Sequence, residues 1–232
     1  MAIRRIFPSR TEAALAQTYS PLEIVISDDC SSDRSFEIAK EIVSKYEGPH
    51  TVILNRNSVN LGIGGHENKR NELVHGDFIT GCAGDDIAMP DKVEIMVERW
   101  LQSDKKKSLF FSNAIIIDED GHECGLYFKD PPRYCATLEE FINDKRSRFK
   151  KILEPSVWVL GATSGGVRVM RKDFGDISPK VMQEDAISSF RSLLSGGMEY
   201  IDKPLVKYRI HLNSVSSKTN YHSVALLLSR EF

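Results

Sequence analysis

Short apolar runs alternate with helix-like stretches through the first half of the chain. The apolar runs have the length and composition of strands and cover residues 22–27, 51–54, 78–82 and 108–117. Helices are predicted between and after them, at residues 36–46, 69–74 and 93–100, with a Gly-rich turn at 61–65. This alternation predicts an α/β fold on a mostly parallel, Rossmann-like sheet with helices on both faces. Ligands of such sheets bind beyond the carboxyl ends of the strands.

The second half of the chain is less regular. After a turn at residues 118–121, the predicted elements are helices at 137–143 and 184–194 and short strands at 198–201 and 205–210. No internal repeat, low-complexity tract or linker separates the halves. We therefore predict one domain over residues 1–232, with an N-terminal half at 1–118 and an irregular C-terminal half at 119–232.

Composition indicates a globular chain with no nucleic-acid partner. The 232 residues are 41% hydrophobic and 28% charged, and the net charge is −2. The basic run at 145–151 is typical of a solvated face, although it could contact anionic lipid headgroups, which leaves peripheral membrane association open. Four cysteines without metal-ligand spacing favour a reduced, cytoplasmic setting. No apolar run reaches the roughly 18 residues of a membrane span, and nothing in the pattern predicts an oligomeric state.

The acidic pair Asp85-Asp86 follows the strand-like run at 78–82. Side chains alternate faces along extended backbone, so one carboxylate can bind a metal while the other binds a sugar hydroxyl. Mg²⁺ takes few protein oxygens and completes its coordination with water and substrate phosphates. The pair therefore indicates a nucleotide-diphosphate site. The alternative is an ordinary acidic turn into a helix that Pro90 opens.

Two further acidic pairs stand at the boundaries of predicted elements. Asp28-Asp29 closes the run at 22–27, where a carboxylate can accept a hydrogen bond from a pyrimidine N–H. The alternative is that Asp29, Ser31, Ser32 and Asp33 cap the next helix, and both roles can coexist. Glu184-Asp185 opens the helix at 184–194, which is favourable for the helix dipole and is also a position for a general base.

The order of these motifs resembles the signature of family 2 glycosyltransferases. Residues 17–33 are similar to its Q-T-Y turn, apolar strand and D-D-x-S-x-D sequence. Further matches in the same order are Asn57, 60–62, 68–70, 76–79, Asp85-Asp86 with Pro90, Glu184-Asp185, 208–211, Ser214 and Ser216. Because the matches span about residues 15–216, their joint order carries the resemblance. It implies the GT-A fold and an inverting sugar transfer from a nucleotide-diphosphate donor.

The resemblance also implies a role for each acidic residue. It places Asp28 or Asp29 at the nucleobase and Asp85 at the ribose and donor sugar. It places Asp86 on a divalent metal, Mg²⁺ or Mn²⁺. Asp185 would be the base that deprotonates the acceptor hydroxyl while the metal stabilises the charge of the leaving group.

Two more residues and the substrates follow from the same resemblance. Asn68 is assigned to the donor site, and His211 to the diphosphate or the metal, with a structural role at the end of the last strand as the alternative for His211. The expected donor is a UDP-sugar bound by the N-terminal half. The expected acceptor is a glycan or lipid-linked molecule of polysaccharide biosynthesis, bound by the C-terminal half. We expect the enzyme in the cytoplasm, with the inner face of the membrane as an option.

Two features depart from the family pattern. Many relatives have a further Asp where this chain has Ala83, although the Ala-x-Asp-Asp variant keeps the metal position. The segment before Gln17 is shorter than the strand, turn and helix of relatives, so we expect an altered wall of the nucleotide pocket. A non-catalytic nucleotide-sugar-binding domain is therefore the alternative function. A sugar nucleotidyltransferase is less favoured, because the chain lacks a Gly-rich, basic stretch after its first strand.

Overall fold

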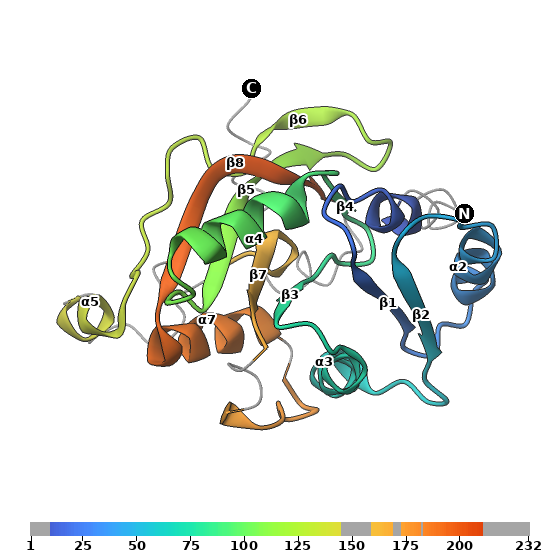
Figure 1. Cartoon of the computed structure of the whole chain (residues 1–232), viewed down its shortest axis with the longest axis horizontal. Coiled ribbons are helices and arrows are strands. Elements are labelled where there is room, and N and C mark those ends of the chain that lie inside the picture. The colour runs from blue at the N-terminus through green and yellow to red at the C-terminus, as the bar shows by residue number, and fades with distance from the viewer. Residues whose placement is uncertain (1–9, 145–158, 169–172, 182, 211–232) are drawn as a thin grey trace.

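A computed structural model describes residues 10–144, 159–168, 173–181 and 183–210 of the chain (Figure 1). The strands are β1 (Glu23–Asp28), β2 (Thr51–Arg56), β3 (Phe78–Thr80), β4 (Ile87–Ala88), β5 (Leu109–Ile117), β6 (Glu123–Leu126), β7 (Ser164–Val167) and β8 (Met198–Arg209). The helices are α2 (Ser35–Val43), α3 (Gly62–Leu73), α4 (Lys92–Gln102), α5 (Leu138–Asn143) and α7 (Glu184–Ser195), with a 3-10 turn, η1, at Gly161–Thr163. Residues 10–15 are also helical.

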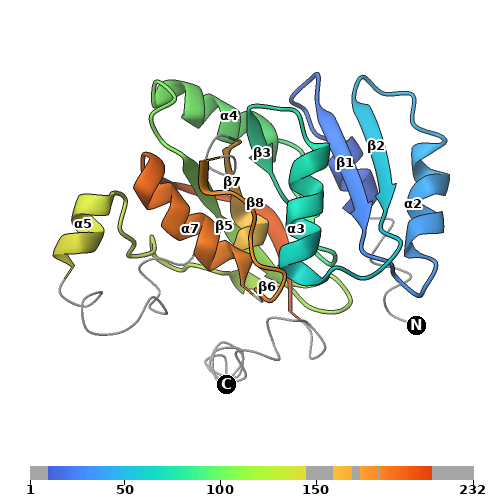
Figure 2. The same ribbon diagram turned by 90° about the horizontal axis from the view of Figure 1, so that it is seen from below.

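The strands form two sheets. β1 and β2 make a parallel two-stranded sheet, and α2 packs against both strands. The other six strands make one sheet in the order β3-β7-β5-β8-β4, with β6 paired to β5. Helix α3 lies where the two sheets meet, beside β1 (Figure 2). The site described below forms at this junction.

The predicted α/β fold is confirmed, but the larger sheet is mixed rather than mostly parallel. Among the described strands, β1–β2 and β5–β8 are parallel. The antiparallel pairings are β3–β7, β4–β8, β5–β6 and β5–β7. A parallel pair needs a long crossover, whereas β6 follows β5 through a short turn and so must run antiparallel. Strand β7 has the sequence Ser-Gly-Gly-Val, which lacks the apolar pattern that would have predicted a strand.

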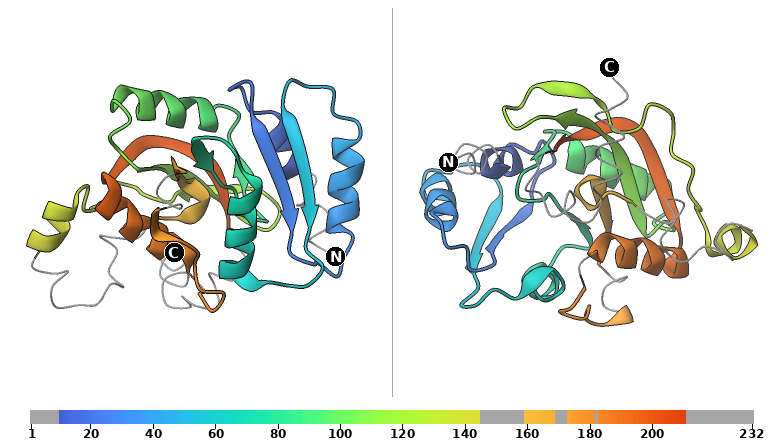
Figure 3. Two further views of the ribbon diagram at one scale, coloured as in Figure 1. Left: turned by 60° about the horizontal axis from the view of Figure 1, so that its bottom comes forward. Right: turned by 180° about the vertical axis from the view of Figure 1, so that it is seen from behind.

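The core of the larger sheet lies on both of its faces. Phe110 packs with Met96 of α4 and Leu205 of β8, whereas its neighbours Leu109 and Phe111 pack with Leu193 of α7. Because successive residues of a strand point to opposite faces, α4 and α7 cover opposite sides of the sheet. Figure 3 shows this arrangement, with α4 above and α7 below the sheet in its left view.

Several predicted boundaries differ from the structure. Helix α2 begins at Ser35 rather than beside Ser31 or Ser32, and Asp33 Oδ1 accepts a hydrogen bond from the Ser35 N–H (2.9 Å). The predicted Gly-rich turn forms the first turn of α3, where Gly64 packs so closely on the Ser178 carbonyl that a Cβ would clash. The two predicted C-terminal strands are one strand, β8, because pairing with β5 continues across a shift in register.

Gln17 links the N-terminal helical segment to the chain that follows the acidic pair Asp85-Asp86. Its side chain is buried, its Nε2 donates to the Met89 carbonyl (2.9 Å), and its Oε1 accepts from the Val93 N–H (3.2 Å). The Thr18 N–H also donates to the Pro90 carbonyl (2.8 Å). The Q-T-Y turn therefore holds the start of α4, and with it one end of the loop that carries the acidic pair.

Candidate active site

The acidic pair lies in the loop between β3 and β4. Asp86 is fully buried, and its Oδ1 accepts a hydrogen bond from the Arg209 N–H of β8 (2.9 Å). Its Oδ2 is also buried and has no hydrogen-bond partner. A buried carboxylate oxygen without a partner costs free energy, because nothing replaces the water it has lost. The position is therefore complementary to a cation.

The surroundings of Asp86 disfavour its negative charge when no ligand is bound. Burial, with the like charge of Asp85, raises the pKa of Asp86 to about 7, against a usual value of 3.8. Among the described residues, no group of three or more His, Cys, Asp or Glu side chains is arranged to hold a metal. One carboxylate fits Mg²⁺ or Mn²⁺, because substrate phosphates and water supply the remaining ligands of such ions.

Sequence reasoning missed a cation, Arg10, that lies among these carboxylates. Its guanidinium is next to Gly84, where a Cβ would come within 2.9 Å of Nη1. Burial lowers the pKa of Arg10, while the charges of Cys82, Asp85, Asp86 and Asp28 raise it. The guanidinium thus lies within electrostatic range of the ends of both β1 and β3. The short segment around Arg10 contains no motif, so the sequence does not indicate that this residue lies near the carboxylates.

Asp28 and Asp29, at the end of β1, have different partners. Asp29 Oδ1 accepts from Asn57 Nδ2 (2.8 Å) and the Leu61 N–H (2.9 Å), and its Oδ2 accepts from the Gly62 N–H (3.1 Å). Asp29 therefore holds the N-terminus of α3, not that of α2. Asp28 is buried, and its carboxylate contacts the Ser31 N–H (3.0 Å) and Arg56 Nε (3.5 Å) through Oδ2.

The structure describes only one of the other two residues assigned to the donor, Asn68 and His211. Asn68, on α3, donates from Nδ2 to the Ile177 carbonyl (2.7 Å) and accepts at Oδ1 from the Ile177 N–H (2.8 Å). These two bonds tie α3 to the segment before α7, so Asn68 has a positioning role whether or not it touches a donor. His211 lies outside the described residues, and its assignment stays a prediction.

Asp185 is half-buried in the first turn of α7, as predicted. Its Oδ2 accepts a hydrogen bond from the Gly161 N–H of η1 (3.0 Å). Burial raises the pKa of Asp185, while the hydrogen bond from Gly161 lowers it. Burial raises the pKa of the Tyr127 hydroxyl, and the charge of nearby Asp185 raises this pKa further. Asp185 therefore has the environment of a carboxylate with increased proton affinity, near Tyr127.

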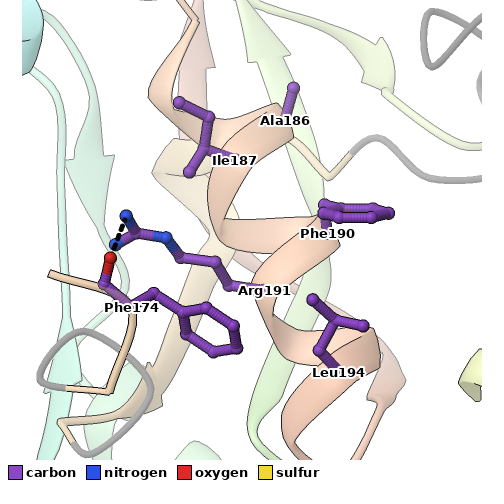
Figure 4. Close-up of a pocket in the computed structure, with 6 residues that line it drawn as sticks. All are labelled: Phe174, Ala186, Ile187, Phe190, Arg191 and Leu194. Carbon is purple, nitrogen blue, oxygen red and sulfur yellow. Dashed lines mark hydrogen bonds between the residues drawn. The ribbon is translucent and has the colours of Figure 1, made fainter. Parts of the chain in front are cut away.

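A shallow pocket of about 300 Å³ lies on α7 but is not part of this site (Figure 4). It is lined by Phe174, Ala186, Ile187, Phe190, Arg191 and Leu194. With 100° between successive helical residues, the centre of this group lies on the opposite side of α7 from Asp185. The pocket is apolar, and the Asp185 carboxylate lies on the other side of the helix.

The mixed sheet, the carboxylates at its edge and the half-buried Asp185 are features of a GT-A-type glycosyltransferase. The chain belongs to glycosyl transferase family 2, whose model matches residues 7–153. The fold is also that of solved GT-A proteins. S. aureus TarS in complex with UDP-GlcNAc covers 98% of this chain with a TM-score of 0.66 at 16% identity. The mannosyltransferase PcManGT of Pyrobaculum calidifontis, in complex with GDP-Man and Mn²⁺, covers 97% with a TM-score of 0.62 at 14% identity.

Curated relatives carry glycosyltransferase names. EpsH of Bacillus subtilis, which is named as a glycosyltransferase, is 27% identical over 209 residues, 88% of this chain and 57% of EpsH. The Escherichia coli protein WfaP, named UDP-Glc:alpha-D-GlcNAc-diphosphoundecaprenol beta-1,3-glucosyltransferase, is 25% identical over 209 residues, 89% of this chain and 72% of WfaP. The chain thus spans little more than half of EpsH and 63% of the TarS chain. No helix among the described residues is long and apolar enough to cross a membrane.

Proposed function

We propose that this chain transfers a sugar from a nucleotide-diphosphate donor to a glycan or lipid-linked acceptor, with inversion and with a divalent metal. The observation that carries the proposal is the buried, unpartnered Oδ2 of Asp86 beside Asp85 in a family 2 chain. A UDP-sugar is the favoured donor, because TarS was solved with UDP-GlcNAc and WfaP is named for UDP-Glc. A guanine nucleotide is the competing donor, since PcManGT was solved with GDP-Man.

On the donor side, the chain binds and orients the nucleotide sugar. Asp28 is better suited than Asp29 to accept a hydrogen bond from the nucleobase, because Asp29 already accepts two at the start of α3 and one from Asn57. Asp85, which is only partly buried, is assigned to the ribose and donor sugar. Asp86 would hold the metal. When bound, Mg²⁺ or Mn²⁺ supplies positive charge against the diphosphate.

On the acceptor side, Asp185 is the proposed general base. Its carboxylate takes the proton of an acceptor hydroxyl as that oxygen forms a bond to the anomeric carbon. The bond from this carbon to the diphosphate oxygen breaks on the opposite face, and the nucleoside diphosphate leaves. The Gly161 N–H fixes the orientation of the carboxylate, and burial increases its proton affinity. A lipid-linked acceptor fits the name of WfaP, and the four free cysteines fit the cytoplasm.

A screen of nucleotide sugars tests this proposal. The melting temperature of the purified chain is measured with UDP-sugars and GDP-mannose, each with Mn²⁺ and with EDTA, because a ligand that binds only the folded state raises it. The proposal requires one donor to stabilise the chain in Mn²⁺ and to be transferred or slowly hydrolysed. It is wrong if no nucleotide sugar binds, or if binding is equal in EDTA and Mn²⁺.

One observation favours a second function, that of a non-catalytic nucleotide-sugar-binding domain. The Arg10 guanidinium lies in the electrostatic field of Asp28, Asp85 and Asp86, where it can neutralise the diphosphate of a ligand without a metal. Donor binding in EDTA without turnover would support this second function. Metal-dependent donor hydrolysis would exclude it.

A further inference from the structure

Lys92, the first residue of α4, carries a charge inside the protein. It is 1% exposed, and its Nζ donates to the Gly81 carbonyl (2.6 Å) and the Ala162 carbonyl (2.7 Å). In the sequence it follows Pro90-Asp91, a position typical of a solvated helix start. A buried ammonium is expensive unless it is hydrogen-bonded and close to opposite charge. Burial lowers the pKa of Lys92, whereas the nearby charges of Cys82 and Asp86 raise it. The two carbonyls supply hydrogen-bond acceptors for Nζ.

The two carbonyls belong to the two loops of the candidate site. Gly81 follows β3 directly and opens the loop that ends in Asp85-Asp86. Ala162 is the middle residue of η1, whose first residue, Gly161, donates its N–H to Asp185 Oδ2 (3.0 Å). One ammonium group therefore bonds to the donor-side loop and to the turn that holds the proposed base.

This link begins where the sheet ends. The described pairing of β3 with β7 stops at Thr80 and Gly165, and Thr80 Oγ1 adds a hydrogen bond to the Ser164 carbonyl (3.1 Å). Beyond these residues, Gly81 and Ala162 each offer a carbonyl to Lys92. The small ammonium head, with three donors, suits two convergent carbonyls better than the planar guanidinium of Arg would.

We propose that Lys92 is a positioning residue for sugar transfer, which sets the placement of the Asp85-Asp86 loop relative to the Asp185 carboxylate. This inference rests on the proposed roles of Asp86 and Asp185. Lys92 touches neither substrate, and it acts through the backbone of both loops. Its removal leaves two buried carbonyls without a donor, so both loops shift or admit water. A displacement of about 1 Å in a reacting group can reduce a rate about 100-fold.

The test compares Lys92→Met with Val97→Ala, a buried change more than one turn further along the same helix. Hydrogen exchange at two backbone amides measures the placement of the two carboxylates and does not require an active enzyme. The Gly161 N–H bonds to Asp185, and the Arg209 N–H bonds to Asp86. We expect hydrogen exchange at both amides to accelerate at least about 10-fold in Lys92→Met, and to stay near the parent rate in Val97→Ala. Equal exchange in the two variants would overturn the proposal.

Kinetics provide the second measurement, at a temperature well below the melting transition of both variants. We expect kcat for transfer to fall about 100-fold in Lys92→Met, with a smaller change in KM for the donor, and to stay near the parent value in Val97→Ala. A purely structural role would lower the melting temperature and leave kcat unchanged. If the parent transfers no sugar, the proposed function fails, and hydrogen exchange still decides whether Lys92 positions the two carboxylates.

Discussion

Asp86→Asn should stabilise the protein without metal while abolishing its response to metal. The carboxylate is fully buried with one unpartnered oxygen, and its pKa is raised by burial and by Asp85 to about 7 from a usual 3.8. In the unfolded chain the group loses its proton near pH 4, and in the native state near pH 7. Between these values the native state binds more protons, so the free energy of unfolding falls as pH rises.

The full difference corresponds to about 4 kcal/mol lost between pH 4 and pH 8. Asn is neutral throughout this range and keeps an oxygen for the Arg209 N–H, so the variant avoids the loss. At pH 8 in EDTA, Asp86→Asn should therefore be more stable than the parent by up to about 4 kcal/mol. Near pH 4 the two should be almost equal. Comparing parent with variant cancels the other titrating groups of the chain.

The assay is urea unfolding of parent and variant at several pH values, in EDTA and in Mn²⁺ with UDP. Mn²⁺ with UDP should raise the stability of the parent at pH 8, because the ligand requires the ionised carboxylate, and should leave Asp86→Asn unchanged. Asp85→Asn, at the partly buried neighbour, is the matched control and should gain less stability than Asp86→Asn, because it removes the like charge but leaves Asp86 buried. The reasoning is refuted if Asp86→Asn is less stable than the parent in EDTA at pH 8, or if it keeps the full response to Mn²⁺.

Three further predictions concern the base and the two sides of the site. Asp185→Asn should reduce transfer by about 10² to 10⁴-fold, with UDP affinity and melting temperature near the parent's, whereas Glu184→Gln should retain transfer. If Asp185→Asn instead loses stability and keeps normal transfer, Asp185 is a helix cap. Arg10→Ala should bind Mn²⁺ about fivefold more tightly in calorimetry, because the Arg10 charge repels a metal cation at the carboxylates by about 1 kcal/mol. Weaker Mn²⁺ binding by the variant would refute this repulsion. Gly161→Ala places a Cβ 3.0 Å from Asp185 Cγ, so kcat should fall while metal affinity holds; an unchanged kcat would show that the carboxylate can move freely.

Local periodicity predicted the elements that carry the candidate site. The apolar spacing of Val93, Met96, Val97 and Trp100 correctly predicted α4, and acidic pairs at element boundaries located the end of β1 and the start of α7. The prediction for β3 was less accurate, because this strand ends at Thr80 rather than Cys82, and Asp85-Asp86 directly precedes β4, which was not predicted. These features depend on near neighbours in the chain. The antiparallel partners of the larger sheet could not be predicted in the same way, because β7 reaches its place through contacts about 85 residues away, such as Thr80 with Ser164.

The residues that sequence reasoning missed share a physical reason. Lys92 and Arg10 look like ordinary surface cations, and only long-range contacts place them against carbonyls and carboxylates. Asn68 was assigned to the donor, and its two hydrogen bonds to Ile177 span 109 residues of sequence. The sequence shows that such groups are present, but their role depends on the contacts that they make in the folded chain. A charged group that folding removes from water must bond to other parts of the protein, and those partners cannot be predicted from near neighbours in the sequence.

Three buried charges at this site differ in how the fold satisfies them. Lys92 bonds to two carbonyls, and Arg10 lies in the field of several carboxylates, whereas Asp86 keeps one buried oxygen unpartnered. The first two charges are thus compensated within the chain, and the third is left for a ligand. Fixed groups that are arranged before the substrate arrives need not reorganise during the reaction. The buried charge of Asp86 costs free energy, and a bound cation would offset this cost. We therefore expect Asp86→Asn both to raise stability and to abolish metal binding.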